Sequence, residues 1–166
     1  MPPDALRLTE SALATRTLQT REFYDTSEVQ ILSASVGVLQ DLGYAIDEIE
    51  KPLGVLSASK RADATNQGQV VGRVALDLAS CFFTFLVACD NENYKKTDDV
   101  QDIRLTLVVL PAAGSATDHT VRVTMQRIVW DRDGRISNQA TIDEAAVYQA
   151  FFSKLDKSVI LERGDT

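Results

Sequence analysis

The chain has 166 residues, 45% of them hydrophobic, and a net charge of −7, which suits one globular domain with a substantial core. The acidic balance argues against nucleic acid or an anionic membrane surface as a partner, because both attract clustered lysine and arginine. Basic residues occur here in runs of at most two, at Lys60–Arg61 and Lys95–Lys96.

The first predicted elements are a leader, a strand and a helix. Residues 1–15 carry two prolines and no sustained hydrophobic period, so we predict a flexible leader. Partial alternation over residues 15–24 predicts a strand. Apolar residues then recur every three or four positions, which predicts a helix over 26–42, with Asp25 and Glu28 forming its capping box. Gly43 stands where a helix ends in a left-handed residue.

The next segment predicts two strands joined by a turn. Residues 44–47 and 55–60 alternate in polarity, and Lys51-Pro52-Leu53-Gly54 between them combines a proline that fixes φ with a glycine that tolerates a positive φ. Four carboxylates occur in or beside this segment, but nothing nearby predicts the burial that would raise the pKa of one of them for acid–base catalysis. These residues are Asp41, Asp47, Glu48 and Glu50.

The most unusual segment is apolar. After a polar linker over residues 62–69, residues 70–89 include twelve uncharged residues from Leu78 to Cys89. This run is shorter than the roughly 20 residues of a bilayer span. Three interpretations stay open: a helix packed on the sheet, an apolar face offered to a partner, ligand or membrane surface, or a buried strand over 81–88.

The two cysteines, Cys81 and Cys89, both belong to the apolar segment. If that segment is helical, their Cα atoms lie about 12 Å apart, which is too far for a disulfide. We interpret them as small buried hydrophobic residues, with an exposed thiol that links two chains as the alternative.

A charged connector over residues 90–102 leads into the second half of the chain. Its acidic residues do not fit a calcium-binding loop, because Lys95 occupies the position that requires glycine. Residues 103–110 alternate strictly and predict a strand that ends at Pro111. A loop of small residues precedes a long predicted strand over 121–130.

The C-terminal third predicts a hairpin and a long helix. The Asp-Gly pair within Asp131–Gly134 is a hairpin signal, so a short strand over 136–140 should pair back onto the preceding one. Thr141 and Glu144 resemble a second capping box, which starts a helix over 143–160. Its apolar stripe is rich in aromatic residues and should cover the core.

Residues that usually carry catalysis are sparse. The only histidine, His119, lies in a Ser/Thr/Asp turn, and no serine or cysteine precedes it in a nucleophile elbow. One histidine and two cysteines in an apolar run do not make a usual zinc site. No glycine-rich phosphate-binding loop is present. We therefore predict that the chain is not an enzyme and has no catalytic, cofactor-binding or metal-binding residues.

Four stretches of the sequence resemble a group of uncharacterised Gram-negative lipoproteins: Thr20–Phe23, Val38–Tyr44, Leu53–Val55 with Ser57–Lys60, and Tyr148–Leu155. The resemblance covers most of the chain from about residue 15 to residue 162. The helix that ends in Leu-Gly-Tyr, followed by an isoleucine strand, a glycine turn and an Ala-Ser-Lys strand, is also similar to the helix-grip domains of BamC-type outer-membrane assembly lipoproteins.

The resemblance implies an accessory or protein-interaction module of the cell envelope. It further implies a periplasmic domain that a lipidated cysteine, upstream of this chain, holds at the outer membrane. The 166 residues themselves contain neither that cysteine nor a signal peptide. The shared motifs are structural, so no functional residue carries over.

Together these features predict a single α+β domain over residues 16–162. An antiparallel sheet of about five strands should pack helices 26–42 and 143–160 on one face, in a helix-grip-like shape with a groove between the C-terminal helix and the sheet. The first hypothesis is a non-enzymatic envelope lipoprotein that binds another envelope protein or itself. The alternative is a carrier of an apolar small molecule or lipid in that groove. Candidate lining residues are Phe82, Phe83, Phe85, Leu86, Phe151 and Phe152.

Overall fold

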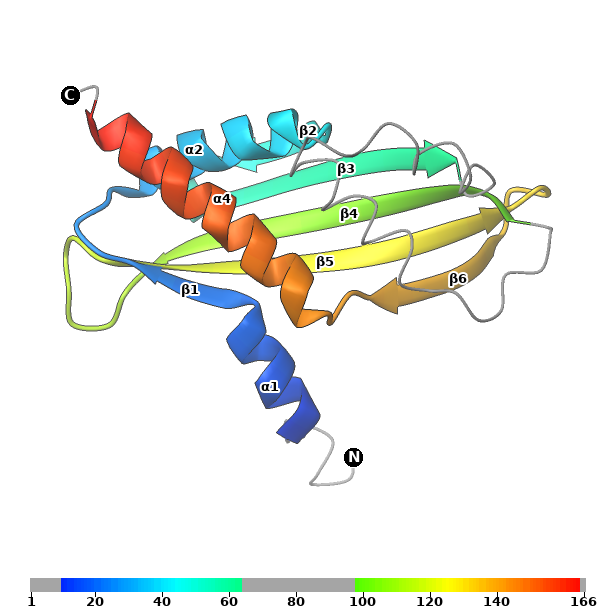
Figure 1. Cartoon of the computed structure of the whole chain (residues 1–166), viewed down its shortest axis with the longest axis horizontal. Helices are drawn as coiled ribbons and strands as arrows, with labels where there is room; N and C mark the ends of the chain where they lie inside the picture. Colours follow the sequence, from blue (N-terminus) through cyan, green and yellow to red (C-terminus); the bar gives the residue numbers. More distant parts are fainter. Residues whose placement is uncertain (1–9, 64–97, 165–166) are drawn as a thin grey trace.

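The computed structural model describes residues 10–63 and 98–164, and these form an α+β domain (Figure 1). The helical elements are α1 (Glu10–Leu18), α2 (Glu28–Asp41), the short 3-10 helix η1 (Lys51–Leu53) and α4 (Ala145–Gly164). The strands are β1 (Thr20–Phe23), β2 (Ala45–Glu50), β3 (Val55–Asp63), β4 (Asp98–Pro111), β5 (His119–Asp131) and β6 (Ile136–Thr141).

The strands form one antiparallel sheet in the order β1-β5-β4-β3-β2. The long strand β5 pairs with β1 over its first part, where Thr20 lies opposite Arg122. It pairs with β6 over its second part, from Gln126 opposite Thr141 to Trp130 opposite Ile136. As a result, β1 and β6 lie end to end along one edge of the sheet, and β2 forms the other edge (Figure 1).

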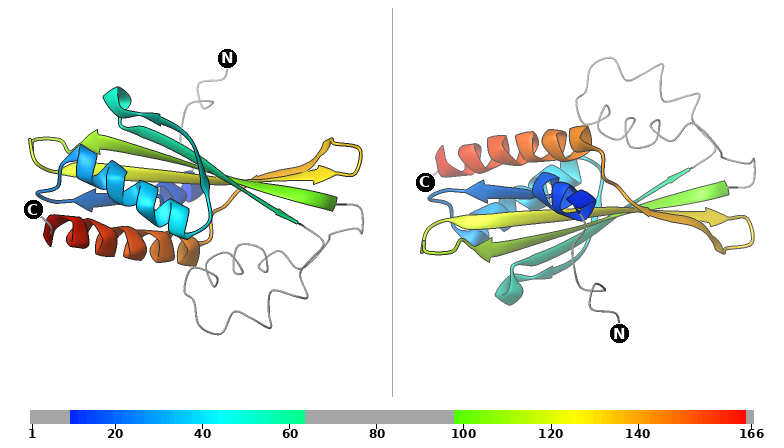
Figure 2. Two further views of the ribbon diagram at one scale, coloured as in Figure 1. Left: turned by 90° about the horizontal axis from the view of Figure 1, so that it is seen from above. Right: turned by 90° about the horizontal axis from the view of Figure 1, so that it is seen from below.

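Helices α2 and α4 lie side by side on one face of the sheet (Figures 1 and 2). Alternate residues of each strand point to this face, and in the central strands these residues are apolar. Two rows in the centre of the sheet are at most 2% exposed: Ile103, Leu105, Leu107 and Val109 of β4, and Val121, Val123 and Met125 of β5. The side chains of Tyr148, Phe151 and Phe152 from α4 complete this core. The predicted α+β fold, with two main helices on one face of an antiparallel sheet, is confirmed.

The N-terminal part differs from the prediction of a leader followed by a strand from residue 15. Residues 10–18 form α1, and the strand begins only at Thr20. No residue of α1 is buried, which explains why this helix leaves no clear hydrophobic period in the sequence. Hydroxyl groups of Thr15 and Thr17 instead bond back to the carbonyls of Ser11 and Leu13, each at 3.0 Å.

Both predicted capping boxes were wrong. Helix α2 is capped by Ser27 and Gln30, because Asp25 has a positive φ of 47° and belongs to the preceding loop. At the start of α4, Thr141 is still part of β6 and lies opposite Gln126, so it cannot cap a helix that begins at Ala145.

The predicted glycine turns are confirmed. Gly43 follows α2 with φ 78°, and Gly54 follows η1 with φ 62°. A Cβ atom on Gly54 would lie 2.5 Å from the carbonyl oxygen of Val109, so only glycine fits there. In the β5–β6 hairpin, the Gly134 N–H donates to the Asp131 carbonyl at 3.0 Å.

Strands β3 and β4 are longer than predicted, because β3 continues to Asp63 and β4 begins at Asp98. Residues 62–63 of the predicted linker and residues 98–102 of the predicted connector are therefore parts of strands. The apolar segment 70–89, with both cysteines, lies outside the described residues. In the part of the chain that the structure does describe, none of the helices is long and apolar enough to cross a membrane.

Candidate functional site

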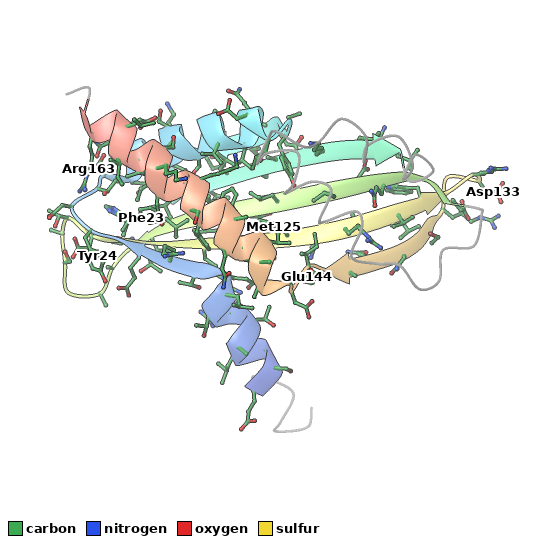
Figure 3. All side chains as sticks on the ribbon, viewed as in Figure 1. Phe23, Tyr24, Met125, Asp133, Glu144 and Arg163 are labelled. Carbon is green, nitrogen blue, oxygen red and sulfur yellow. The ribbon has the colours of Figure 1, made fainter. Side chains whose placement is uncertain are left out.

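Several connections meet at one end of the domain, which we call the loop end (Figure 1). It comprises the β1–α2 loop (residues 24–27), the β4–β5 loop (residues 112–118), the first turn of α2 and the last turn of α4. The opposite end carries the β5–β6 hairpin. Figure 3 labels Tyr24 and Arg163 at the loop end and Asp133 at the hairpin.

Three consecutive carbonyl groups of the β1–α2 loop accept hydrogen bonds from distant side chains. The Arg163 guanidinium, near the end of α4, donates to the carbonyls of Tyr24, at 2.7 Å, and Asp25. The third carbonyl, that of Thr26, lies 2.7 Å from Nδ1 of His119. This loop is therefore fixed in position by α4 and by the first residue of β5.

The bond to Thr26 also defines the histidine tautomer. A carbonyl oxygen only accepts, so Nδ1 of His119 must carry the proton. In the neutral ring, Nε2 is then a hydrogen-bond acceptor. His119 thus combines a structural role at one nitrogen with an acceptor at the other.

The β4–β5 loop holds the same segment from its other side. The Asp25 N–H donates to Oδ1 of Asp118 at 3.0 Å, and the Thr26 N–H donates to the carbonyl of Thr117 at 3.2 Å. The bond from the Asp25 backbone, followed by one involving Ser115, lowers the pKa of the Asp118 carboxyl. These bonds hold Asp25 at its positive φ, a conformation that costs energy in most residues other than glycine.

A cavity of about 670 Å³ lies between the two loops and the start of α2. Three of its lining residues, Asp25, Glu28 and His119, carry acceptor groups. The Glu28 carboxylate lies beside Gly54, so Asp25 and His119 are the main candidates for contact with a ligand. Val29 adds an apolar side chain that is 71% exposed, and neighbouring Tyr24 is 63% exposed. The lining consists of Asp25, Thr26, Ser27, Glu28, Val29, Gln30, Ala116, Thr117 and His119.

This arrangement suits binding better than catalysis. The Ser27 hydroxyl accepts the Gln30 N–H at 3.3 Å as the helix cap, so it is not aligned with His119 as a nucleophile. The acceptor groups of Asp25 and His119 match donor groups such as a lysine, an arginine or an amide. Within the described ranges, no group of three or more His, Cys, Asp or Glu residues could hold a metal ion.

A second polar cluster lies towards the hairpin end. Asp102, which is 8% exposed, accepts bonds from Arg61 at 2.9 and 3.3 Å and from the Trp130 indole at 3.2 Å. The hydrogen bonds from Arg61 are the main cause of a lowered pKa of Asp102. A shallow cavity of about 300 Å³ adjoins Arg61 and Trp130. Both carboxylate oxygens of Asp102 are used internally, so this cluster stabilises the sheet.

The residues predicted to line a ligand groove fall into two groups. Phe151 and Phe152 are 0% and 2% exposed and pack edge to face, with ring centroids 5.7 Å apart. Arg21 covers the ring of Phe152, with its guanidinium 5.4 Å from the centroid. The other four candidates, Phe82, Phe83, Phe85 and Leu86, lie outside the described residues.

Sequence reasoning located His119 before a strand but missed its contact with Thr26, 93 residues away in the chain. It also missed Arg163, whose bonds are made to backbone carbonyls of the β1–α2 loop. Backbone carbonyls have no sequence signature, so only the fold reveals these two contacts.

Comparison with known proteins assigns no family: no protein-family model matches the chain, and no curated protein matches it significantly. A function for the chain therefore has to be inferred from the geometry of its surface and from the resemblance of its sequence.

Proposed function

We propose that this chain is a non-enzymatic protein-interaction module of the bacterial cell envelope, and that it binds its partner with the loop end. One observation carries the proposal. The loop end is held rigidly by side chains from α4 and β5, yet it exposes Tyr24 and Val29 beside an acceptor-lined cavity. Surfaces that are fixed before binding lose less entropy when a partner docks.

The chemistry of the cavity favours a particular class of partner. Asp25 and His119 contribute residues with acceptor groups to the lining, while Val29 contributes an exposed apolar side chain. A partner segment that carries a lysine or arginine next to an apolar residue would match both features. The net charge of −7 would also attract such a basic segment over distance.

The envelope location is proposed from the sequence resemblance. The lipoproteins that the chain resembles carry a lipidated cysteine upstream of a domain of this kind, which implies a periplasmic domain tethered to the outer membrane. The upstream coding sequence tests this part: we expect a signal peptide that ends in a lipidation motif. An upstream coding sequence that encodes no signal peptide would contradict it.

Photo-crosslinking tests the docking surface. We expect a photoreactive amino acid at Val29 to capture a defined partner in intact cells, because this side chain projects from the loop end. The same probe at Glu48, exposed on β2 at the opposite edge of the sheet from β6, is the matched control. The purified partner should then bind Val29→Glu at least about tenfold more weakly than wild type, a change of roughly 1.4 kcal/mol. Equal capture at both positions would contradict the proposal.

The carrier alternative has less support in the described residues. Phe151 and Phe152 already pack against each other and against the sheet, so a ligand that reached them would have to displace core contacts. Native mass spectrometry of the purified chain tests this alternative directly, because a carrier should retain a bound apolar molecule.

A further inference from the structure

Strand β6 (Ile136–Thr141) presents an unusual sheet edge. All six of its residues are exposed, and none is charged. The Ile142 N–H donates to the carbonyl of Met125 at 2.9 Å. Because hydrogen bonding alternates along an antiparallel pair, the N–H and C=O groups of Gln139 and Thr141 point away from β5. Among the described residues, no strand pairs with that side of β6.

The other edge of the sheet is protected and β6 is not. Exposed edges are usually blocked by charged side chains, proline or bulges, because they can pair with another chain. Strand β2 carries Asp47, Glu48 and Glu50 and a register shift after Ile46. In β6 the one register shift lies at its Ile136 end, so the rest of the strand has a regular, uncharged edge.

The residues that flank β6 have opposite charges. Arg135 precedes the strand, and Asp143 and Glu144 follow it. Arg135 and Asp143 lie four residues before and four residues after Gln139. Within residues 10–63 and 98–164, no ion pair is recorded for either of them. A strand with basic and acidic ends is complementary to an antiparallel copy of itself.

We propose that two copies of this chain associate through antiparallel pairing of β6 with β6 of the second copy, centred on Gln139. This register joins the outward-facing backbone groups of Gln139 and Thr141 to a partner strand. It also places Arg135 of each copy opposite Asp143 of the other, so two ion pairs form around the twofold axis. The two sheets become one continuous sheet, and the loop ends remain free at its outer limits.

Helix α1 lies beside this surface. Gln19, just after α1, donates to the Tyr148 hydroxyl at 3.3 Å, and that hydroxyl donates to the Ile142 carbonyl at 2.7 Å. Helix α1 therefore projects from the same edge, next to the end of β6 (Figure 1). None of its residues is buried, and Leu13 is 49% exposed. Isolated helices shorter than about 12 residues are marginal in water, so this exposed helix is available for contact with a second copy.

Charge reversal tests the ion pairs. In analytical ultracentrifugation of the full chain, we expect a monomer–dimer equilibrium that Arg135→Glu and Asp143→Arg each weaken by about tenfold or more. The double variant Arg135→Glu/Asp143→Arg should recover dimerisation, because the reversed charges again face each other. Lys157→Glu, an exposed site on α4 with the same charge change, is the control and should leave the equilibrium unchanged.

A second pair of variants tests the register and does not depend on Arg135. Gln139 faces itself across the axis, so Gln139→Lys alone and Gln139→Glu alone should be monomeric, whereas their equimolar mixture should dimerise. Circular dichroism melting would verify that each variant is folded.

Three outcomes would overturn the proposal. The first is a wild-type chain that stays monomeric up to several hundred micromolar, even if β6 then pairs with a strand of another protein. The second is a dimer whose dissociation constant is unchanged by both charge reversals. The third is a Lys/Glu mixture that associates no better than either variant alone.

Discussion

The two ends of the sheet use their polar side chains in opposite ways. At the hairpin end, both oxygens of Asp102 accept bonds from Arg61 and Trp130, so the carboxylate is fully used inside the fold. At the loop end, Arg163 and His119 bond to backbone carbonyls of the β1–α2 loop. Two residues of that end with acceptor side chains, Asp25 and His119, also line a cavity.

The comparison distinguishes polar groups that stabilise the fold from polar groups that remain available to a ligand or partner. A buried carboxylate whose two oxygens both accept bonds from the chain itself contributes stability and has no free oxygen for a ligand. A loop that is fixed through its backbone keeps its side chains free for recognition. We therefore place binding at the loop end, although both ends carry carboxylates and arginines.

The largest expected effect on stability belongs to the hairpin end. Asp102→Ala should lower the free energy of unfolding by about 2 kcal/mol, because it removes the acceptor of the Trp130 indole N–H and the charged hydrogen bonds from Arg61. Chemical denaturation at neutral pH measures the change. Partner binding at the loop end should be unaffected, and Asp133→Asn on the exposed hairpin should be neutral.

The same residue gives a pH dependence with a defined sign. Arg61 lowers the pKa of Asp102 in the folded state below its ordinary value of 3.8. Its contribution is therefore present above about pH 4 and is lost as the pH falls through the lower folded-state value. The stability gap between wild type and Asp102→Ala should narrow in acid, and a gap that widens there would contradict the assignment.

A smaller effect is expected at the loop end, where Asp25 has a positive φ of 47°. Asp25→Gly should be more stable than Asp25→Ala by about 1 kcal/mol, because glycine adopts this conformation without a Cβ penalty. Both variants lack the carboxylate, so both should bind the partner more weakly to the same extent. Binding losses that follow stability instead would assign Asp25 a purely structural role.

Elements with strong local signals were predictable from the sequence. The turn at Gly54 and the hairpin at Gly134 follow from glycines that adopt a positive φ, and the apolar stripe of α4 follows from its helical period. The choice of cap for α2 was not predictable in the same way. Asp25 with Glu28 and Ser27 with Gln30 both have the required spacing, and the contact of the Asp25 N–H with Asp118 excludes the first pair.

The candidate site was less predictable because it is assembled from distant segments. Arg163 bonds to carbonyls 138 and 139 residues earlier in the chain, and any residue could supply those carbonyls. His119 was visible as the only histidine, but its hydrogen bond to Thr26 depends on how β5 aligns with β1. Local patterns specify elements, whereas this site depends on the order of strands in the sheet.

The tautomer of His119 tests most directly whether the loop end is fixed through its backbone and presents acceptors to the cavity. Because the chain has a single histidine, nitrogen-15 NMR of the imidazole ring gives one unambiguous pair of signals. We predict that the neutral ring carries its proton on Nδ1, bonded to the Thr26 carbonyl, with Nε2 as an unprotonated acceptor. A ring protonated on Nε2, or one that exchanges freely between both forms, would contradict this account.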